Sequence, residues 1–221
     1  MTTPTMDTPV AQPKAESFLD WFRINSRMVT IASVVVAAAA FGFWFYNRSA
    51  VLKAENADRK LLAAKQSLGS GNIPLAQSDL KKVADQYPTT SAGAEAGMLL
   101  AQVQLDQGEN QNAVTTLKDL AAKNASGPYA ATLRGLLGDA YSQLGKYAEA
   151  AAEYERAAQA TTLPNERALL LAKIGRAQGA AGNLAKAREA WQALANQTDN
   201  ASLAAEARVR LGELLATAAK G

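Results

Sequence analysis

Four glycines recur at a fixed spacing of 37 residues, and this period constrains the fold more than any other feature of the chain. A small residue stands seven places before each glycine, an alanine stands five places after it, and a bulky residue follows four places later. Chance alignment in an alanine-rich sequence would explain one or two such columns, but not four. The columns are Gly71, Gly108, Gly145 and Gly182; Ala64, Ala101, Gly138 and Gly175; Ala76, Ala113, Ala150 and Ala187; Leu80, Leu117, Tyr154 and Trp191. Gly212 continues the small-residue column into a fifth half-unit.

The columns predict pairs of helices joined at the glycines. A glycine readily adopts the left-handed conformation that ends a helix. In the helix after it, the alanine, the bulky residue and a further apolar residue lie at i, i+4 and i+7, which is one helical face. Small residues let two helix backbones approach closely, and such pairs bury their apolar faces by stacking on neighbouring pairs. The sequence therefore predicts an all-α solenoid of helical hairpins.

The segment LLGDAYSQLGKYAEAAAEYERA, residues 136–157, resembles the tetratricopeptide repeat at every place but the leading tryptophan, where Arg134 stands. The resemblance implies a tetratricopeptide-like solenoid over residues 48–221, with units near 57–93, 94–130, 131–167 and 168–204 and a capping helix at 205–221. Because the usual period of this repeat is about 34 residues, we expect the extra residues in the connections around Thr89, Ser126 and Leu163. The cap is expected to face solvent with Glu206, Arg210, Glu213 and Lys220.

An uncharged apolar run of 19 residues, Met28 to Tyr46, precedes the repeats and ends in four aromatic residues. As a helix it measures about 28 Å, which is close to the thickness of a bilayer core. We expect a transmembrane helix over residues 28–47 after a disordered tail over residues 1–27, and one unbroken helix from the membrane through Leu68. A buried core helix and a signal peptide cleaved near Ala38–Ala40 are the alternatives.

The order of the segments adds a more specific resemblance. The tail ends in FLDWFRINSR, the apolar run and an alanine-rich helix follow, and the second unit contains YPTTSAGAEAGMLLAQVQLDQGENQNAVTTLKDLA. Together these are similar to the YfgM-type family of ancillary SecYEG translocon subunits. The resemblance implies a single-pass protein of the bacterial inner membrane with a cytoplasmic N-terminus and periplasmic repeats. It also implies two partners, the translocon and a membrane-anchored periplasmic chaperone of the prolyl-isomerase type. The basic residues near the apolar run do not favour this orientation, but a large domain can translocate regardless of such charges.

The composition argues against an enzyme, because the chain has no histidine and no cysteine. The commonest general base, the commonest metal ligand and the thiol nucleophile are therefore missing, and no serine stands in a nucleophile-elbow context. We expect no catalytic site, no metal and no cofactor. The formal net charge of +3 is too small and too dispersed for a nucleic-acid groove.

In tetratricopeptide arrays the first helix of each pair lines the concave face, and the resemblance places a protein-binding groove there. A clamp for a C-terminal carboxylate is disfavoured, because asparagine is absent from these places and Leu99 and Leu136 stand where clamp residues would be. A mixed groove with Met98 and Leu105 suits a helix or an unfolded segment better. An ordinary solvated face is the alternative. The predicted groove residues are Asp58, Leu61, Lys65, Glu95, Met98, Gln102, Asp139, Ser142, Gln143 and Arg176.

Four aromatic residues at repeat positions, Tyr141, Tyr147, Tyr154 and Trp191, are expected in the core rather than on a stacking surface. The sequence as a whole predicts a membrane-anchored scaffold that binds other proteins through its repeats at the translocon. A structural assembly factor of cell-wall or outer-membrane biogenesis is the alternative function.

Overall fold

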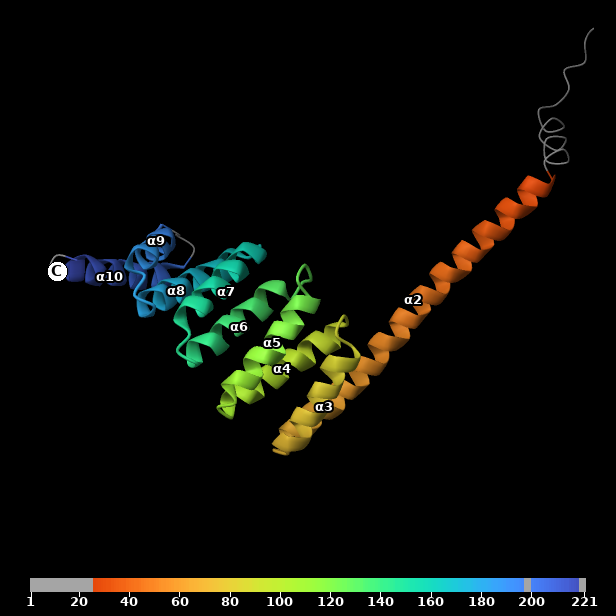
Figure 1. Cartoon of the computed structure of the whole chain (residues 1–221), viewed down its shortest axis with the longest axis horizontal. Coiled ribbons are helices and arrows are strands. Elements are labelled where there is room, and N and C mark those ends of the chain that lie inside the picture. The colour runs from red at the N-terminus through yellow and green to blue at the C-terminus, as the bar shows by residue number, and fades with distance from the viewer. Residues whose placement is uncertain (1–25, 197–199, 219–221) are drawn as a thin grey trace, which may run out of the picture. The chain divides into compact units, whose positions relative to one another are not determined.

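The structure, a computed structural model, describes residues 26–196 and 200–218. Every regular element within these residues is an α-helix, which confirms the predicted all-α class. The helices are α2 (Ser26–Gly69), α3 (Ile73–Gln86), α4 (Ser91–Asp106), α5 (Asn110–Lys123), α6 (Ala130–Gln143), α7 (Tyr147–Ala160), α8 (Pro164–Ala180), α9 (Leu184–Ala195) and α10 (Ala201–Ala218), as labelled in Figure 1.

The chain divides into two compact units, residues 1–52 and 53–221. In the first unit the described residues form the beginning of α2, which continues without a break to Gly69 as predicted. From Met28 to Tyr46 the apolar side chains are exposed, apart from the half-buried Val29, so the alternative of a buried core helix is wrong. By length and composition, α2 is a candidate membrane span. Most of the predicted tail lies outside the described residues, and Ser26 and Arg27 belong to α2.

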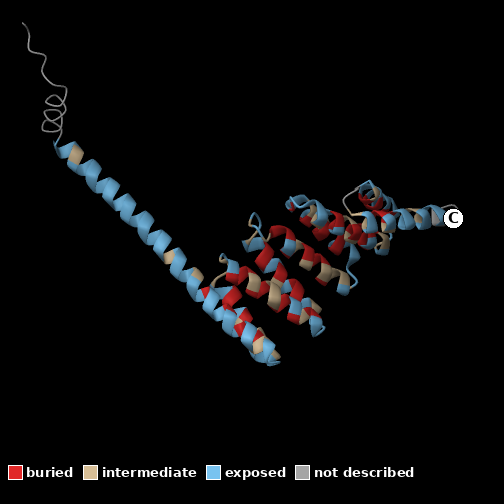
Figure 2. Ribbon diagram, turned by 180° about the vertical axis from the view of Figure 1, so that it is seen from behind, coloured by how far each residue is buried: buried red, intermediate tan, exposed pale blue. Residues whose placement is uncertain are grey.

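The second unit is a series of helical hairpins. We call α2 from Lys53 onward, α4, α6, α8 and α10 the A helices, and α3, α5, α7 and α9 the B helices. Each A helix packs against the B helix that follows it, and α10 packs against α9 and α8 without a B helix of its own among the described residues. Figure 2 shows the buried residues concentrated where the hairpins contact one another.

The four glycines of the period form the turns inside the hairpins. Each has a positive φ, between 71° and 79°, in the left-handed region where a side chain would be strained. After Gly71 the backbone N–H of Asn72 donates to the carbonyl of Ser67 at 3.0 Å, which satisfies one of the last carbonyls of α2. The same bond runs from Lys146 to Tyr141 at 2.9 Å after Gly145. The predicted left-handed helix ends are therefore confirmed.

The extra residues of the period are only partly in the connections between hairpins, so that prediction needs correction. The connection at residues 124–129 is the longest, and α6 after it has 14 residues. The connection at residues 161–163 is the shortest, and α8 after it has 17 residues. The period is constant because an A helix starts earlier where its connection is shorter. Pro164 begins α8, and proline is suited to the first turn of a helix because the backbone N–H that it lacks would have no partner within the helix there.

The core of each hairpin is a small residue on the A helix beneath a bulky residue on the B helix. In the first two units the pairs are Ala64 with Leu80 and Ala101 with Leu117, and in the next two they are Gly138 with Tyr154 and Gly175 with Trp191. A Cβ added at Gly138 would lie 2.4 Å from the Tyr154 ring, and one at Gly175 would lie 2.5 Å from the Trp191 ring. Glycine therefore stands where the partner is aromatic, and alanine where it is leucine.

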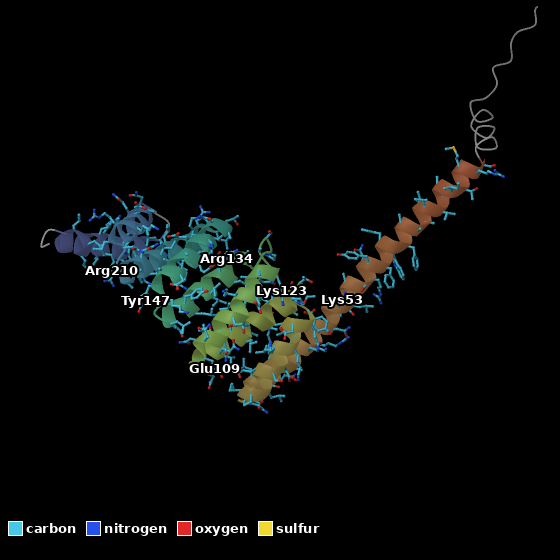
Figure 3. All side chains as sticks on the ribbon, viewed as in Figure 1. Lys53, Glu109, Lys123, Arg134, Tyr147 and Arg210 are labelled. Atoms are coloured by element: carbon cyan, nitrogen blue, oxygen red, sulfur yellow. The ribbon has the colours of Figure 1, made fainter. Side chains whose placement is uncertain are left out.

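The aromatic residues follow the core prediction in part. Tyr154 and Trp191 are buried, whereas Tyr141 is half-buried. Tyr147 lies at the first position of α7 and is exposed, so its assignment to the core is wrong. It precedes the buried face of α7, which begins at Ala150 (Tyr147 is labelled in Figure 3).

Candidate protein-binding face

The predicted groove residues lie on the A helices, where their charged side chains are largely paired within the chain. Leu61 is a correction, because it is buried in the cluster that joins α2, α3 and α4. Leu105 is also core rather than groove. The remaining predicted residues are exposed or half-buried.

Two ion pairs join successive A helices at equivalent places of the repeat. Lys65 on α2 pairs with Glu95 on α4, and Arg176 on α8 pairs with Glu206 on α10. The second pair is bidentate: Nη2 of Arg176 lies 2.7 and 2.8 Å from the two oxygens of Glu206. Both pairs join residues 30 places apart in sequence, so α10 contacts α8 as α4 contacts α2.

Asp139 is the centre of a third bridge, between α6 and α8. The ammonium of Lys173 lies 2.7 and 2.8 Å from its two oxygens, and the hydroxyl of Tyr154 donates to it at 2.7 Å. The same ammonium lies 5.4 Å from the centre of the Tyr154 ring. Burial first, and then the hydrogen bond and negative charge of Asp139, raise the pKa of Tyr154 above its usual value, so the hydroxyl stays protonated as a donor.

The middle of the A-helix face is less charged. Gln102 donates to Asp106 on its own helix at 2.9 Å, and Met98 is half-buried against the cluster that joins α4, α5 and α6. Leu136 packs on the same cluster from α6. Asp58 and Gln143 lie exposed at the surface. This part of the face therefore combines polar and apolar side chains.

A recess of about 400 Å³ lies at the end of this face, where α8, α9 and α10 meet. Gly175 and Gly179 leave room on α8, the ring of Trp191 contributes apolar surface, and Arg176 and Arg210 line its sides. Arg176 is held by Glu206 and Arg210 pairs with Glu213 at 2.9 Å, so the cations here are neutralised within the chain. The recess therefore lacks the uncompensated cations of a carboxylate clamp.

Arg134, which replaces the leading tryptophan of the repeat, has a partner that the sequence did not suggest. Its guanidinium lies 3.2 Å from a carboxylate oxygen of Glu153 on α7, and Arg156 contacts the other oxygen (Arg134 is labelled in Figure 3). Glu153 is only 8% exposed, and a carboxylate so buried needs such partners. An ion pair between α6 and α7 is thus found where the leading tryptophan of the repeat would make an aromatic contact.

Sequence reasoning also missed Lys173 and Glu206 on the A-helix face. Glu206 could have been found, because it lies three periods after Glu95, in the same column. Lys173 could not, since its column contains leucine at Leu62, Leu99 and Leu136. Within residues 26–196 and 200–218 the structure shows no group of acidic residues suited to a metal ion.

The ion pairs between A helices should contribute little to stability. Arg176 and Glu206 are exposed by 52% and 29%, so solvent screens their attraction. We expect a double-mutant cycle of Arg176→Ala and Glu206→Ala to give a coupling below about 1 kcal/mol that decreases in high salt. Denaturant unfolding at two salt concentrations measures it. A salt-independent coupling of several kcal/mol would contradict the account of a screened surface pair.

The comparisons with known proteins agree with the hairpin architecture. The tetratricopeptide repeat-like domain family matches residues 54–176. No curated protein matches the chain. Among solved structures, a protein with nearly identical TPR-like repeats from Podosopora anserina aligns with a TM-score of 0.57 at 18% identity, over 74% of this chain and 87% of that one. A tetratricopeptide repeat protein from Parabacteroides merdae aligns with a TM-score of 0.60 at 15% identity, over 74% and 61%.

At such identities the structures support the fold alone. The family match covers more than half of the chain, and it includes the turns at Gly71, Gly108 and Gly145 that the period predicted. Tetratricopeptide repeats typically serve as non-catalytic scaffolds for protein–protein interaction, in keeping with the missing catalytic chemistry. This chain belongs to the tetratricopeptide repeat-like domain family.

Proposed function

We propose that this protein is a membrane-anchored periplasmic scaffold that associates with the Sec translocon and a membrane-anchored periplasmic chaperone through its repeats. The support is the joint occurrence of a candidate membrane span and a protein-binding fold in one chain. The similarity of the chain to the YfgM-type family adds the identity of the partners. The cellular location is the bacterial inner membrane, crossed once.

The observation that carries the proposal is the continuity of α2. The helix begins as an exposed apolar segment at Ser26 and ends at Gly69 as the first A helix, with Ala57 and Ala64 buried in the repeat core. No loop separates the anchor from the first repeat. The repeat domain is therefore tethered directly to the bilayer that holds its partners, and the tether raises their effective concentration.

Co-purification of the tagged full-length chain in mild detergent tests the proposal. Translocon subunits and a periplasmic prolyl-isomerase-type chaperone are the expected partners. Recovery of cell-wall or outer-membrane assembly enzymes instead would support the alternative function, a structural assembly factor of envelope biogenesis. An untethered control lacking residues 1–47 should lose most of the recovered partners, because the tether no longer concentrates them.

The proposed topology can be tested separately. A reporter that is active only in the periplasm, fused after Gly221, should be active, and protease added to spheroplasts should degrade the repeat domain. The reason is that a domain of this size can translocate whatever the charge of its first residues. A repeat domain that survives protease until the membrane is permeabilised would place it in the cytoplasm and refute the proposal.

A further inference from the structure

The last helix, α10, has an uncovered face that matches the buried faces of the other A helices. Three columns of the 37-residue period form this face, and in α10 they end at Ala205, Val209 and Gly212. The equivalent residues in the other A helices are Ala57, Ala94, Ala131 and Ala168; Leu61, Met98, Gly135 and Ala172; Ala64, Ala101, Gly138 and Gly175.

These columns are covered in every hairpin and open in α10. In the other four A helices all twelve positions are buried, except Met98, which is half-buried. In α10, Ala205 and Gly212 are exposed, Val209 is 61% exposed, and Leu215 beside them is 59% exposed. Figure 2 shows the outer part of α10 as exposed ribbon.

The predicted solvent face of the cap is confirmed in part. Arg210 and Glu213 are exposed as expected, whereas Glu206 faces Arg176 on the neighbouring A helix and Lys220 lies outside the described residues. A helix at the end of a repeat array normally carries a polar outer face. In α10 the three columns that B helices cover elsewhere carry an alanine, a valine and a glycine, and among the described residues no B helix lies over them.

The open face reproduces the binding face of α6 in particular. Gly212 is two periods after Gly138, and Arg208 is two periods after Arg134. Arg134 lies 3.2 Å from Glu153 of the covering helix, α7. A Cβ on Gly138 would clash with an α7 side chain, whereas one on Gly212 has nothing within 4 Å. The small-residue surface and the adjacent cation that α7 covers on α6 are thus both present, and uncovered, on α10.

We propose that this face binds one amphipathic helix of a partner protein, with an aromatic residue over Gly212 and a glutamate immediately before it, beside Arg208. The partner helix has the pattern of α7, in which Ala150, Glu153 and Tyr154 cover α6. We expect the aromatic residue because the two glycines of this column in complete hairpins, Gly138 and Gly175, lie beneath Tyr154 and Trp191. The proposal deepens the scaffold function, on which it rests, by naming the chemistry of a partner.

A second copy of α10 does not meet these requirements. The helix Ala201–Ala218 contains no aromatic residue, so two copies packed face to face would leave the surface over Gly212 without the ring that covers Gly138 and Gly175. Arg208 is exposed beside this surface, and a symmetric pair would bring two such cations to one interface. A helix that complements this surface therefore carries an acidic residue beside Arg208 and an aromatic residue over Gly212.

The test uses the full-length chain in detergent micelles and a labelled, helix-stapled peptide of the α7 sequence Tyr147–Ala160 as the probe. We expect saturable binding by fluorescence anisotropy. Gly212→Leu places a side chain where the aromatic ring of the partner would lie and should weaken binding about tenfold or more, while Glu189→Leu on the exposed side of α9 should not. A peptide with Tyr154→Ala should bind more weakly by a similar factor, because it has no ring to cover Gly212.

A charge exchange isolates the ionic contact. Arg208→Glu should weaken binding of the unmodified peptide about tenfold. A peptide with Glu153→Arg should bind the Arg208→Glu variant with the original affinity, but should not bind the parent chain better than the unmodified peptide does. Unchanged melting temperatures of the variants exclude unfolding as the cause. The proposal is overturned by the absence of saturable binding below about 1 mM, by equal binding to Gly212→Leu, or by sedimentation of a dimer that Gly212→Leu dissociates. These results are independent of whether translocon subunits co-purify, so the two proposals fail separately.

Discussion

Replacing Ala150 with leucine should lower the free energy of unfolding of the repeat domain by about 3 kcal/mol. Ala150 has no exposed surface and lies in the cluster of α7 and α8 that contains Tyr154, Leu170 and Ile174. A leucine there requires the helices to separate, and a domain of this kind has only about 5–15 kcal/mol of stability in total. Denaturant unfolding of the full-length chain in detergent, followed by circular dichroism, measures the loss.

Gln143→Ala is the control for this variant. Gln143 is exposed at the end of α6, so its truncation should change the free energy of unfolding by less than about 0.5 kcal/mol. If Ala150→Leu unfolded like the parent chain, Ala150 would face solvent. The 37-residue register would then be wrong, together with the assignment of the A-helix face.

Replacing Gly175 with alanine should cost about 2 kcal/mol, although alanine favours helices more than glycine does. The new Cβ would lie 2.5 Å from the ring of Trp191, so either the ring or the helix must move. Gly212→Ala is the matched control, because Gly212 is the next residue of the same column and has nothing within 4 Å. That variant should be neutral, or more stable by up to about 1 kcal/mol.

A second substitution should relieve this clash. Trp191→Leu alone leaves a cavity over Gly175, but together with Gly175→Ala it recreates the alanine–leucine pair found at Ala101 and Leu117. The double variant should therefore lose at least about 1 kcal/mol less stability than the sum of the two single variants. Additive losses would show that the two columns do not contact each other as the structure indicates.

Much of the hairpin architecture could be predicted because glycine and alanine have few roles in a helical repeat. A glycine at each period marks a left-handed helix end, and Gly71 and Gly145 both adopt this conformation. The small-residue column marks the contact between the two helices of a hairpin. A further alanine column, which ends at Ala168 and Ala205, was overlooked because alanine is common throughout the chain.

The details of the A-helix face could not be predicted in the same way. The pairing of Lys65 with Glu95 depends on the distance between successive A helices, which the period does not specify. The predicted extra residues in the connections were partly wrong for a similar reason, since a helix can take up such residues at its N-terminus, as α8 does. On the A-helix face a charged residue therefore predicted at least partial exposure, but not whether the charge has a partner in the chain.

If the membrane-anchored repeat domain binds translocon-associated proteins through its A helices, as we propose, residues on this face must lie close to those proteins in the cell. A photoreactive amino acid placed at Gln102 or Gln143 in the full-length chain in living cells measures this proximity. Both residues are exposed on A helices, and Lys118, exposed on the B helix α5, provides the matched control. We expect crosslinks to translocon subunits or to a periplasmic chaperone from Gln102 and Gln143 but not from Lys118. Crosslinks only to abundant bystanders, or the same products from all three positions, would refute the proposed interaction.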